Sequence, residues 1–103
     1  MTKKRILNIR TVTDGVPGQE EVDAFVLRQK FCGYTFFIYK SYKTGDKEWV
    51  ITEYETGGRV DSVKYKYEAT NQIESILERV GADKFRKTIE EKKAAFGTVN
   101  KLP

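Results

Sequence analysis

Histidine is absent from the 103-residue sequence, cysteine and proline are scarce, and no hydrophobic run is long. The absence of histidine removes the side chain that most often transfers protons near neutral pH, which is also the commonest zinc ligand. The single cysteine, Cys32, rules out an internal disulfide and a cysteine-rich metal site. We therefore expect no bound metal and no cofactor.

Sequence motifs for phosphate binding and for nucleophilic catalysis are missing as well. No GxGxxG, GxxxxGKS/T or GxSxG pattern occurs, and the pair Gly57-Gly58 stands alone. Glu53 and Glu55 could form a carboxylate pair for hydrolysis if both leave one face of a strand. Acids near the end of a strand more often discourage pairing with another sheet. The sequence therefore predicts a protein that is not an enzyme.

Length and composition indicate one soluble domain over residues 1–103, with frayed ends at 1–5 and 97–103. Hydrophobic residues make up 39% and charged residues 33% of the chain, which is ordinary for a globular domain. No apolar run approaches the roughly 20 residues that cross a bilayer, and the basic start lacks the apolar stretch of a signal peptide. We expect a cytoplasmic protein with no membrane partner.

The pattern of apolar and β-branched residues predicts an antiparallel meander of four or five strands. The strands are expected at residues 6–13, 22–31, 34–42 and 48–55, and residues 59–67 are expected to form a short edge strand or an ordered loop. Leu7 and Ile9 are expected to face the core. Residues 14–18 are predicted as a loop, because glycine permits positive φ and Pro17 cannot continue a ladder.

Two C-terminal helices are predicted after the sheet. One apolar stripe recurs at helical spacing and consists of Ile73, Ile76, Leu77 and Val80. Thr70 or Asn71 is expected to cap the start of this helix, and Gly81 its end. A second, largely polar helix is expected over residues 83–95.

The predicted third strand follows a turn at Cys32-Gly33 and is apolar on both of its sides. A strand of that kind usually lies in the centre of its sheet or contacts something on each face. Together the elements predict an α+β fold in which both helices pack on one face of the sheet. The other face would stay open unless a partner covers it.

The stretch from Ala24 to Gly45 is rich in aromatic and basic residues and contains no acid. Nucleic acid needs cations for its phosphates and flat side chains for its unstacked bases, and a sheet surface can present both. The residues expected to form this surface, with one from the first strand, are Arg10, Arg28, Lys30, Tyr34, Phe36, Lys40, Tyr42 and Lys43. The alternative is that most of these rings are core, and no RNP-like motif decides between the two.

The segment WVITEYETGGRV, from Trp49 to Val60, and the two helices predicted on either side of Gly81 resemble small proteins of bacteriophages and prophages. Those proteins pair a strand and turn of the form W-x-I/V-x-E-x-x-T-G with two helices, and the resemblance covers about residues 34–96. It implies an accessory role, either in phage DNA transactions or in blocking a host defence protein, in the cytoplasm of the host. It carries no active-site residue over to this chain.

The sequence thus predicts a small non-catalytic binding domain whose ligand is nucleic acid, with single strands favoured. One alternative is an accessory protein that binds and inhibits a host protein. Another is an adaptor that associates with itself as a homodimer. Both stay open because an aromatic, basic surface serves protein docking as well as base stacking.

Overall fold

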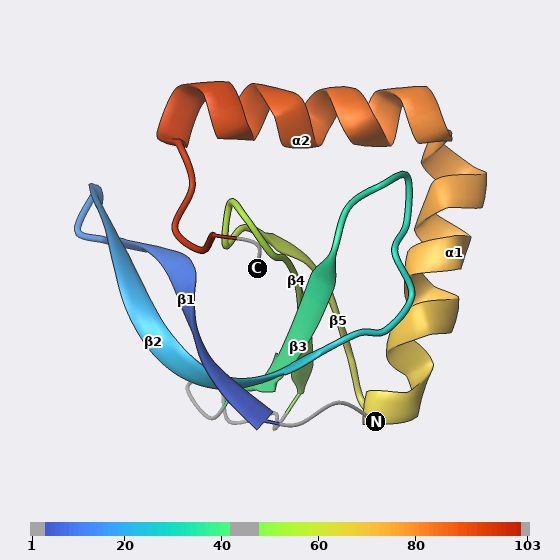
Figure 1. Ribbon diagram of the computed structural model, residues 1–103, viewed down its shortest axis with the longest axis horizontal. Helices are drawn as coiled ribbons and strands as arrows, with labels where there is room; N and C mark the ends of the chain where they lie inside the picture. The colour runs from blue at the N-terminus through green and yellow to red at the C-terminus, as the bar shows by residue number, and fades with distance from the viewer. Residues whose placement is uncertain (1–3, 42–47, 102–103) are drawn as a thin grey trace.

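The structure, a computed structural model, describes residues 4–41 and 48–101 (Figure 1). Its elements are β1 (Lys4–Thr13), β2 (Val16–Val26), β3 (Phe36–Lys40), β4 (Trp49–Glu53), β5 (Arg59–Val63), a 3-10 helix η1 (Lys66–Glu68), α1 (Ala69–Val80) and α2 (Ala82–Phe96). The strands lie in the order β1-β2-β3-β4-β5, each antiparallel to its neighbours. The predicted α+β class and the meander are confirmed. In the described part of the chain, no helix is long and apolar enough to cross a membrane.

β1 and β2 form a long hairpin whose tip extends past the other strands (Figure 1). Its turn is Asp14-Gly15, with φ angles of +52° and +78°, and an Asp-Gly pair favours such a two-residue turn. The loop predicted for residues 14–18 is therefore wrong beyond Gly15. Pro17 is tolerated in β2 because β3 pairs only with residues 24–26, which leaves the outer part of β2 as an edge.

Between β2 and β3 the chain leaves the sheet, so β2 ends at Val26 instead of residue 31 and β3 begins at Phe36 instead of residue 34. The predicted turn at Cys32-Gly33 is present, with φ angles of +54° and +85°. Phe31 and Tyr34 flank it and exchange two backbone hydrogen bonds, of 3.0 Å and 2.9 Å. Phe31 is buried and its ring centroid lies 5.9 Å from that of Phe36, which holds this excursion against the core.

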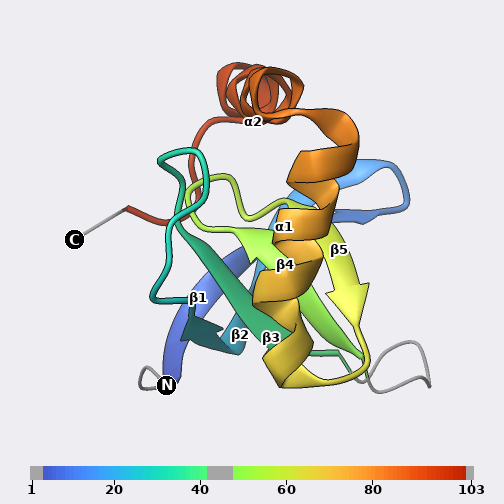
Figure 2. The same cartoon turned by 90° about the vertical axis from the view of Figure 1, so that its right-hand side faces the viewer.

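One core lies between the sheet and the two helices (Figure 2). Its main buried residues are Phe36, Ile38, Ile51 and Val63 from the sheet and Ile73, Ile76, Phe85 and Ile89 from the helices. Packing of both helices on one face is therefore confirmed, as is the central place of β3. η1 leads directly into α1 at Ala69, so neither Thr70 nor Asn71 is the cap that was predicted. Gly81, with φ of +93°, turns the chain at once into α2.

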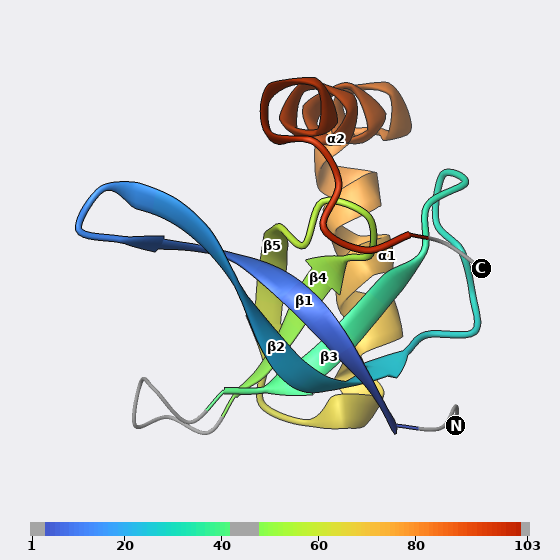
Figure 3. The ribbon, with the colours of Figure 1, turned by 60° about the vertical axis from the view of Figure 1, so that its left-hand side comes forward.

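The second face of the sheet is covered by the strands themselves. A separate buried cluster lies there, made of Leu7, Ile9, Ala24, Phe37 and Tyr54. Phe37 is fully buried, and its ring meets that of Tyr54 edge to face at 6.0 Å. The β1–β2 hairpin curls across β3 and β4 on this side (Figure 3). The expectation that this face stays open unless a partner covers it is wrong, because the twisted β1–β2 hairpin of the same chain covers it.

The segment after α2 holds this curl in place. Asn100 is 8% exposed, and its Nδ2 donates to the carbonyls of Asn8 and Tyr54, both at 2.8 Å. Its Oδ1 accepts the backbone N–H of Asn8 at 2.9 Å. Nearby, the N–H of Arg10 donates to the carbonyl of Gly57 at 2.9 Å. Gly97, Val99 and Asn100, from the segment 97–103 in which fraying is expected, thus bond to β1 or to the turn after β4. Residues 102–103 fall outside the described residues.

The opposite edge of the sheet, β5, is protected by its own side chains. The backbone N–H of Ser62 donates to Asp61 Oδ1 at 2.8 Å, and Asp61 Oδ2 accepts from Gln72 of α1 at 2.7 Å. A carboxylate that occupies an outward N–H and brings negative charge to the edge discourages another strand from pairing there.

Replacing Asn100 with alanine should lower the free energy of unfolding by about 1–3 kcal/mol, because the buried carbonyl of Tyr54 would lose its donor. Urea unfolding followed by circular dichroism measures the change. Lys101→Ala is the matched control: Lys101 is exposed, and its loss should change stability by less than about 0.5 kcal/mol. Equal stability of the two variants would show that Asn100 does not hold the curl.

Thr52 Oγ1 is buried and has no hydrogen-bond partner among the described residues, so Thr52→Val should raise the free energy of unfolding by about 1 kcal/mol. Thr56 provides the matched control. It is equally buried, but its Oγ1 accepts the N–H of Gly58 at 3.2 Å, so Thr56→Val should lower stability by about 1 kcal/mol. Thermal or urea unfolding compares the two; a loss at both sites would mean that the Thr52 hydroxyl is satisfied.

Candidate nucleic-acid interface

The eight residues predicted to share one open surface lie in different environments. Phe36 is fully buried, and its ring centroid lies 5.9 Å from that of Phe85 in α2. Its ring cannot stack on a base, so its assignment to the binding surface is wrong. The reason is that it points to the sheet face that the helices cover. Tyr42 and Lys43 fall outside the described residues.

Tyr34 is half-buried and its hydroxyl donates a hydrogen bond to Glu90 Oε2 of α2 at 2.5 Å. Burial, then the hydrogen bond to Glu90 and the negative charge of Glu90, raise the pKa of Tyr34 from 10.0 to about 12. The side chain therefore ties the Cys32-Gly33 turn to α2 rather than facing an open sheet surface.

The predicted cations that the structure describes lie in three separate places. Arg10 lies beside α2, with its guanidinium 5.0 Å from the centroid of the Phe96 ring. Arg28 and Lys30 are exposed just after β2, and Lys40 lies over Trp49 at the far end of the sheet. The continuous basic track expected from Arg10 to the third strand is not formed, because the twist of β1 carries Arg10 toward α2.

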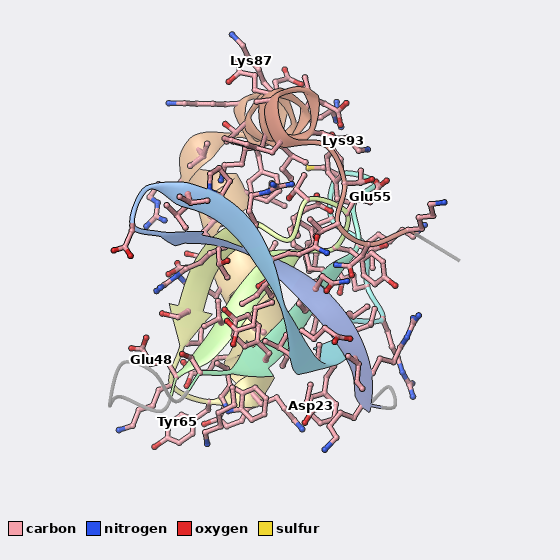
Figure 4. The ribbon with its side chains drawn as sticks, turned by 90° about the vertical axis from the view of Figure 1, so that its left-hand side faces the viewer. Asp23, Glu48, Glu55, Tyr65, Lys87 and Lys93 are labelled. Atoms are coloured by element: carbon pink, nitrogen blue, oxygen red, sulfur yellow. The ribbon has the colours of Figure 1, made fainter. Side chains whose placement is uncertain are left out.

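Aromatic and basic side chains gather instead at the end of the sheet away from α2. Trp49 opens β4 and pairs with Val63, so the residues that follow β5 lie beside it. Figure 4 shows Tyr65 at this end and Lys87 of α2 at the other. We refer to this surface as the aromatic end; its members are Phe25, Arg28, Lys40, Trp49, Lys64, Tyr65, Lys66 and Tyr67.

Lys66 is held at the centre of the aromatic end by two rings. Its Nζ lies 4.0 Å from the ring centroid of Phe25 and 5.2 Å from that of Trp49. Lys40 Nζ lies 5.4 Å from the same Trp49 ring. Cation–π contacts at exposed sites contribute about 0.5–1 kcal/mol each. Neither lysine forms an ion pair with a residue that the structure describes, so both charges are available to a ligand.

Tyr65 and Tyr67 form a stacked pair on the outside of the aromatic end. Their ring centroids lie 5.6 Å apart, the ring planes differ by 8°, and the residues are 47% and 79% exposed. Lys64 Nζ lies 5.5 Å from the centroid of Tyr65. Paired rings left largely in water beside cations are the features of a surface that stacks on a flat ligand.

A hollow of about 300 Å³ adjoins this pair. Arg28 and Lys66 line it together with Tyr67, and no acid is among the described residues of its lining. A larger hollow of about 560 Å³ at the same end mixes lysines with two acids, Glu20 and Asp23. The smaller hollow is therefore the better place for an anionic group, because its charges have one sign.

The carboxylates of Glu53 and Glu55 have separate structural partners. Glu53 is 2% exposed, and its oxygens accept the backbone N–H groups of Glu55 at 2.7 Å and Thr56 at 3.0 Å. Glu55 pairs with Lys93 of α2 at 3.0 Å, and both are labelled in Figure 4. The two acids hold the turn after β4 and do not form the paired surface considered from the sequence. Within residues 4–41 and 48–101, no group of three His, Cys, Asp or Glu residues could hold a metal ion.

Comparison with known proteins yields no match among protein-family models, curated proteins or solved structures. The resemblance to bacteriophage and prophage proteins therefore stays a prediction. The function has to be argued from the surface itself.

Six of the eight residues of the aromatic end were not predicted as binding residues from the sequence: Phe25, Trp49 and the run at residues 64–67. For residues 64–67 the signal was the alternation Lys-Tyr-Lys-Tyr, which lies in the segment predicted to be a short edge strand or an ordered loop. β5 stops at Val63, so the run leaves the sheet and places both tyrosines outside it.

The raised pKa of Tyr34 predicts a pH dependence of stability. A tyrosine pKa that is higher in the folded state favours the neutral phenol there, so this stabilisation is complete below pH 10 and is lost as the pH rises toward about 12. The difference in unfolding free energy between the parent and Tyr34→Phe should shrink over that interval, measured by urea unfolding. Tyr67→Phe, at an exposed ring, is the control. A difference that stays constant would mean that the Tyr34 phenol has no raised pKa.

Proposed function

We propose that this protein is a non-catalytic nucleic-acid-binding domain that prefers single strands and contacts them through the aromatic end. The observation that supports the proposal is the exposed, stacked pair Tyr65 and Tyr67 flanked by Lys64 and Lys66. This run of four residues supplies two rings and two ammonium groups. Together they offer one surface for a base and for the phosphates on either side of it.

Single strands are favoured because their bases can leave the stack. An unpaired base that stacks on a tyrosine contributes about 1–3 kcal/mol, whereas a duplex exposes base faces only at its ends. Tyr67, the more exposed ring of the pair, has the accessible area that such a contact needs. The adjacent hollow with Arg28 and Lys66 then receives the backbone phosphate.

The rings of Phe25 and Trp49 also favour phosphate binding at Lys66. Because Phe25 and Trp49 hold its ammonium group in place, less side-chain entropy is lost when an anion binds. Acids at the same end limit the gain: Asp23 lies 3.8 Å from Lys4, and Glu48 accepts a hydrogen bond from Ser62 at 2.8 Å. We therefore expect micromolar affinity at low salt.

Self-association as a homodimer, one of the two alternatives considered from the sequence, gains no support from the described sheet edges. Asn100 and Gly57 occupy backbone groups of β1, and Asp61 occupies one of β5. A second copy would have to displace these contacts before it could pair.

Fluorescence anisotropy with a labelled oligothymidylate of about 12 nucleotides, within the usual range of site sizes, tests the proposal. Tyr67→Ala should weaken binding about tenfold, because one stacking contact is lost. Lys64→Gln and Lys66→Gln together should reduce the slope of log K against log salt by about 1.4, since each phosphate contact on a single strand contributes about 0.7.

Lys87→Gln, on α2 at the opposite end, is the matched control and should bind like the parent (Figure 4). No binding at micromolar protein in low salt would refute the proposed function. Equal losses in Tyr67→Ala and Lys87→Gln would refute its location. A duplex of the same length that binds as tightly as the single strand would refute the preference.

A further inference from the structure

Another hollow, of about 250 Å³, lies between the β1–β2 hairpin, the turn after β4 and the C-terminal half of α2. Figures 1 and 3 show these three elements together, at the end of the molecule away from the aromatic end. The proposed nucleic-acid function does not use it. We refer to it as the α2 hollow; the residues that matter are Arg10, Val12, Pro17, Arg59, Lys92 and Phe96.

Every charged side chain on the described walls of the α2 hollow is a cation: Arg10, Arg59 and Lys92. The guanidinium of Arg10 is already bound, because its Nη2 donates to the carbonyls of Phe96 at 3.0 Å and Gly97 at 3.3 Å. It thereby offsets the negative end of the α2 dipole.

Arg59 and Lys92 are both exposed, and neither forms an ion pair with a described residue. The acid on the adjoining turn, Glu55, lies 3.0 Å from Lys93 instead. Arg59 Nη2 donates to Ser62 Oγ at 3.1 Å, a neutral hydroxyl that leaves the charge of the guanidinium unpaired. Two positive charges therefore lie at the rim of the α2 hollow.

Apolar surface accompanies these charges. Val12 is 71% exposed and Phe96 is 55% exposed, and they face the hollow together with Pro17. Phe96 is the one ring on the described walls, and the Arg10 guanidinium lies over it at 5.0 Å. Most of this apolar surface is aliphatic and offers no second ring for a base to stack on, so an apolar side chain of a protein is the better occupant.

The volume of the α2 hollow favours a protein partner over a free small-molecule ligand. Sites for whole small molecules usually measure about 300–1,000 Å³, and this hollow is smaller. We propose that the α2 hollow docks a partner protein that inserts one apolar side chain flanked by carboxylates. The apolar group contacts Val12 and Phe96, and the carboxylates pair with Arg59 and Lys92. This surface is separate from the aromatic end, so the proposal does not depend on nucleic-acid binding.

The test uses the full chain labelled with ¹⁵N and follows its amide shifts by NMR. The probe is the peptide acetyl-Asp-Phe-Glu-amide, and the control peptides are acetyl-Lys-Phe-Lys-amide and acetyl-Asp-Gly-Glu-amide. We expect saturable shifts at Gly58, Arg59, Lys92 and Phe96 with the first peptide and much weaker ones with either control. Arg59→Gln combined with Lys92→Gln should weaken binding about fivefold, the loss of two exposed ion pairs. Lys87→Gln, elsewhere on α2, should leave affinity unchanged.

Four results would overturn the proposal. No shifts at millimolar peptide would exclude docking of this chemistry. Equal shifts with the basic peptide would remove the role of charge, and equal shifts with the glycine peptide would remove the role of the apolar side chain. Shifts at the same amides with oligothymidylate instead of peptide would assign the α2 hollow to nucleic acid. The spectrum of each variant reports directly whether it is folded.

Discussion

The side-chain amide of Asn100 bonds to the first strand and to the chain just after the fourth: it donates to the carbonyls of Asn8 and Tyr54 and accepts the N–H of Asn8. Gly57 lies at the same junction, where a Cβ would stand 2.6 Å from Val99 Cγ2 and 3.0 Å from the nitrogen of Arg10. The three segments therefore meet with no room for a side chain at Gly57. This junction keeps the β1–β2 hairpin curled, and the second core cluster depends on that curl.

The location of both proposed surfaces follows from this closure. Helices cover one face of the sheet and the curled hairpin covers the other, while side chains and the β4–β5 turn occupy backbone groups at both edges. The two surfaces proposed to bind ligands lie instead at the two ends of the sheet. The aromatic end carries rings that can accept a base, and the α2 hollow carries cations beside aliphatic surface. Their different chemistry fits two different ligands.

Much of the fold could be predicted because it depends on local patterns. Leu7 and Ile9 face the core as their alternation indicates, β3 is central as its two apolar sides indicate, and Gly81 separates two helices. The cover of the second face could not be predicted, since it depends on a contact between residues 92 positions apart. The same contact affects the candidate site in part. Phe37 belongs to the core because the curled hairpin covers its face, whereas Phe36 belongs to the core because the helices cover the opposite face.

The hydrogen bonds between Asn8 and Asn100 also bear on the order in which the molecule folds. The Asp14-Gly15 hairpin closes over two residues, whereas joining Asn8 to Asn100 closes nearly the whole described chain and loses far more conformational entropy. We expect the hairpin and the helix-covered core to form first, and the hydrogen bonds between Asn8 and Asn100 to form last. An intermediate without these hydrogen bonds would expose Phe37 and Tyr54 to solvent, and would be the species most prone to aggregate.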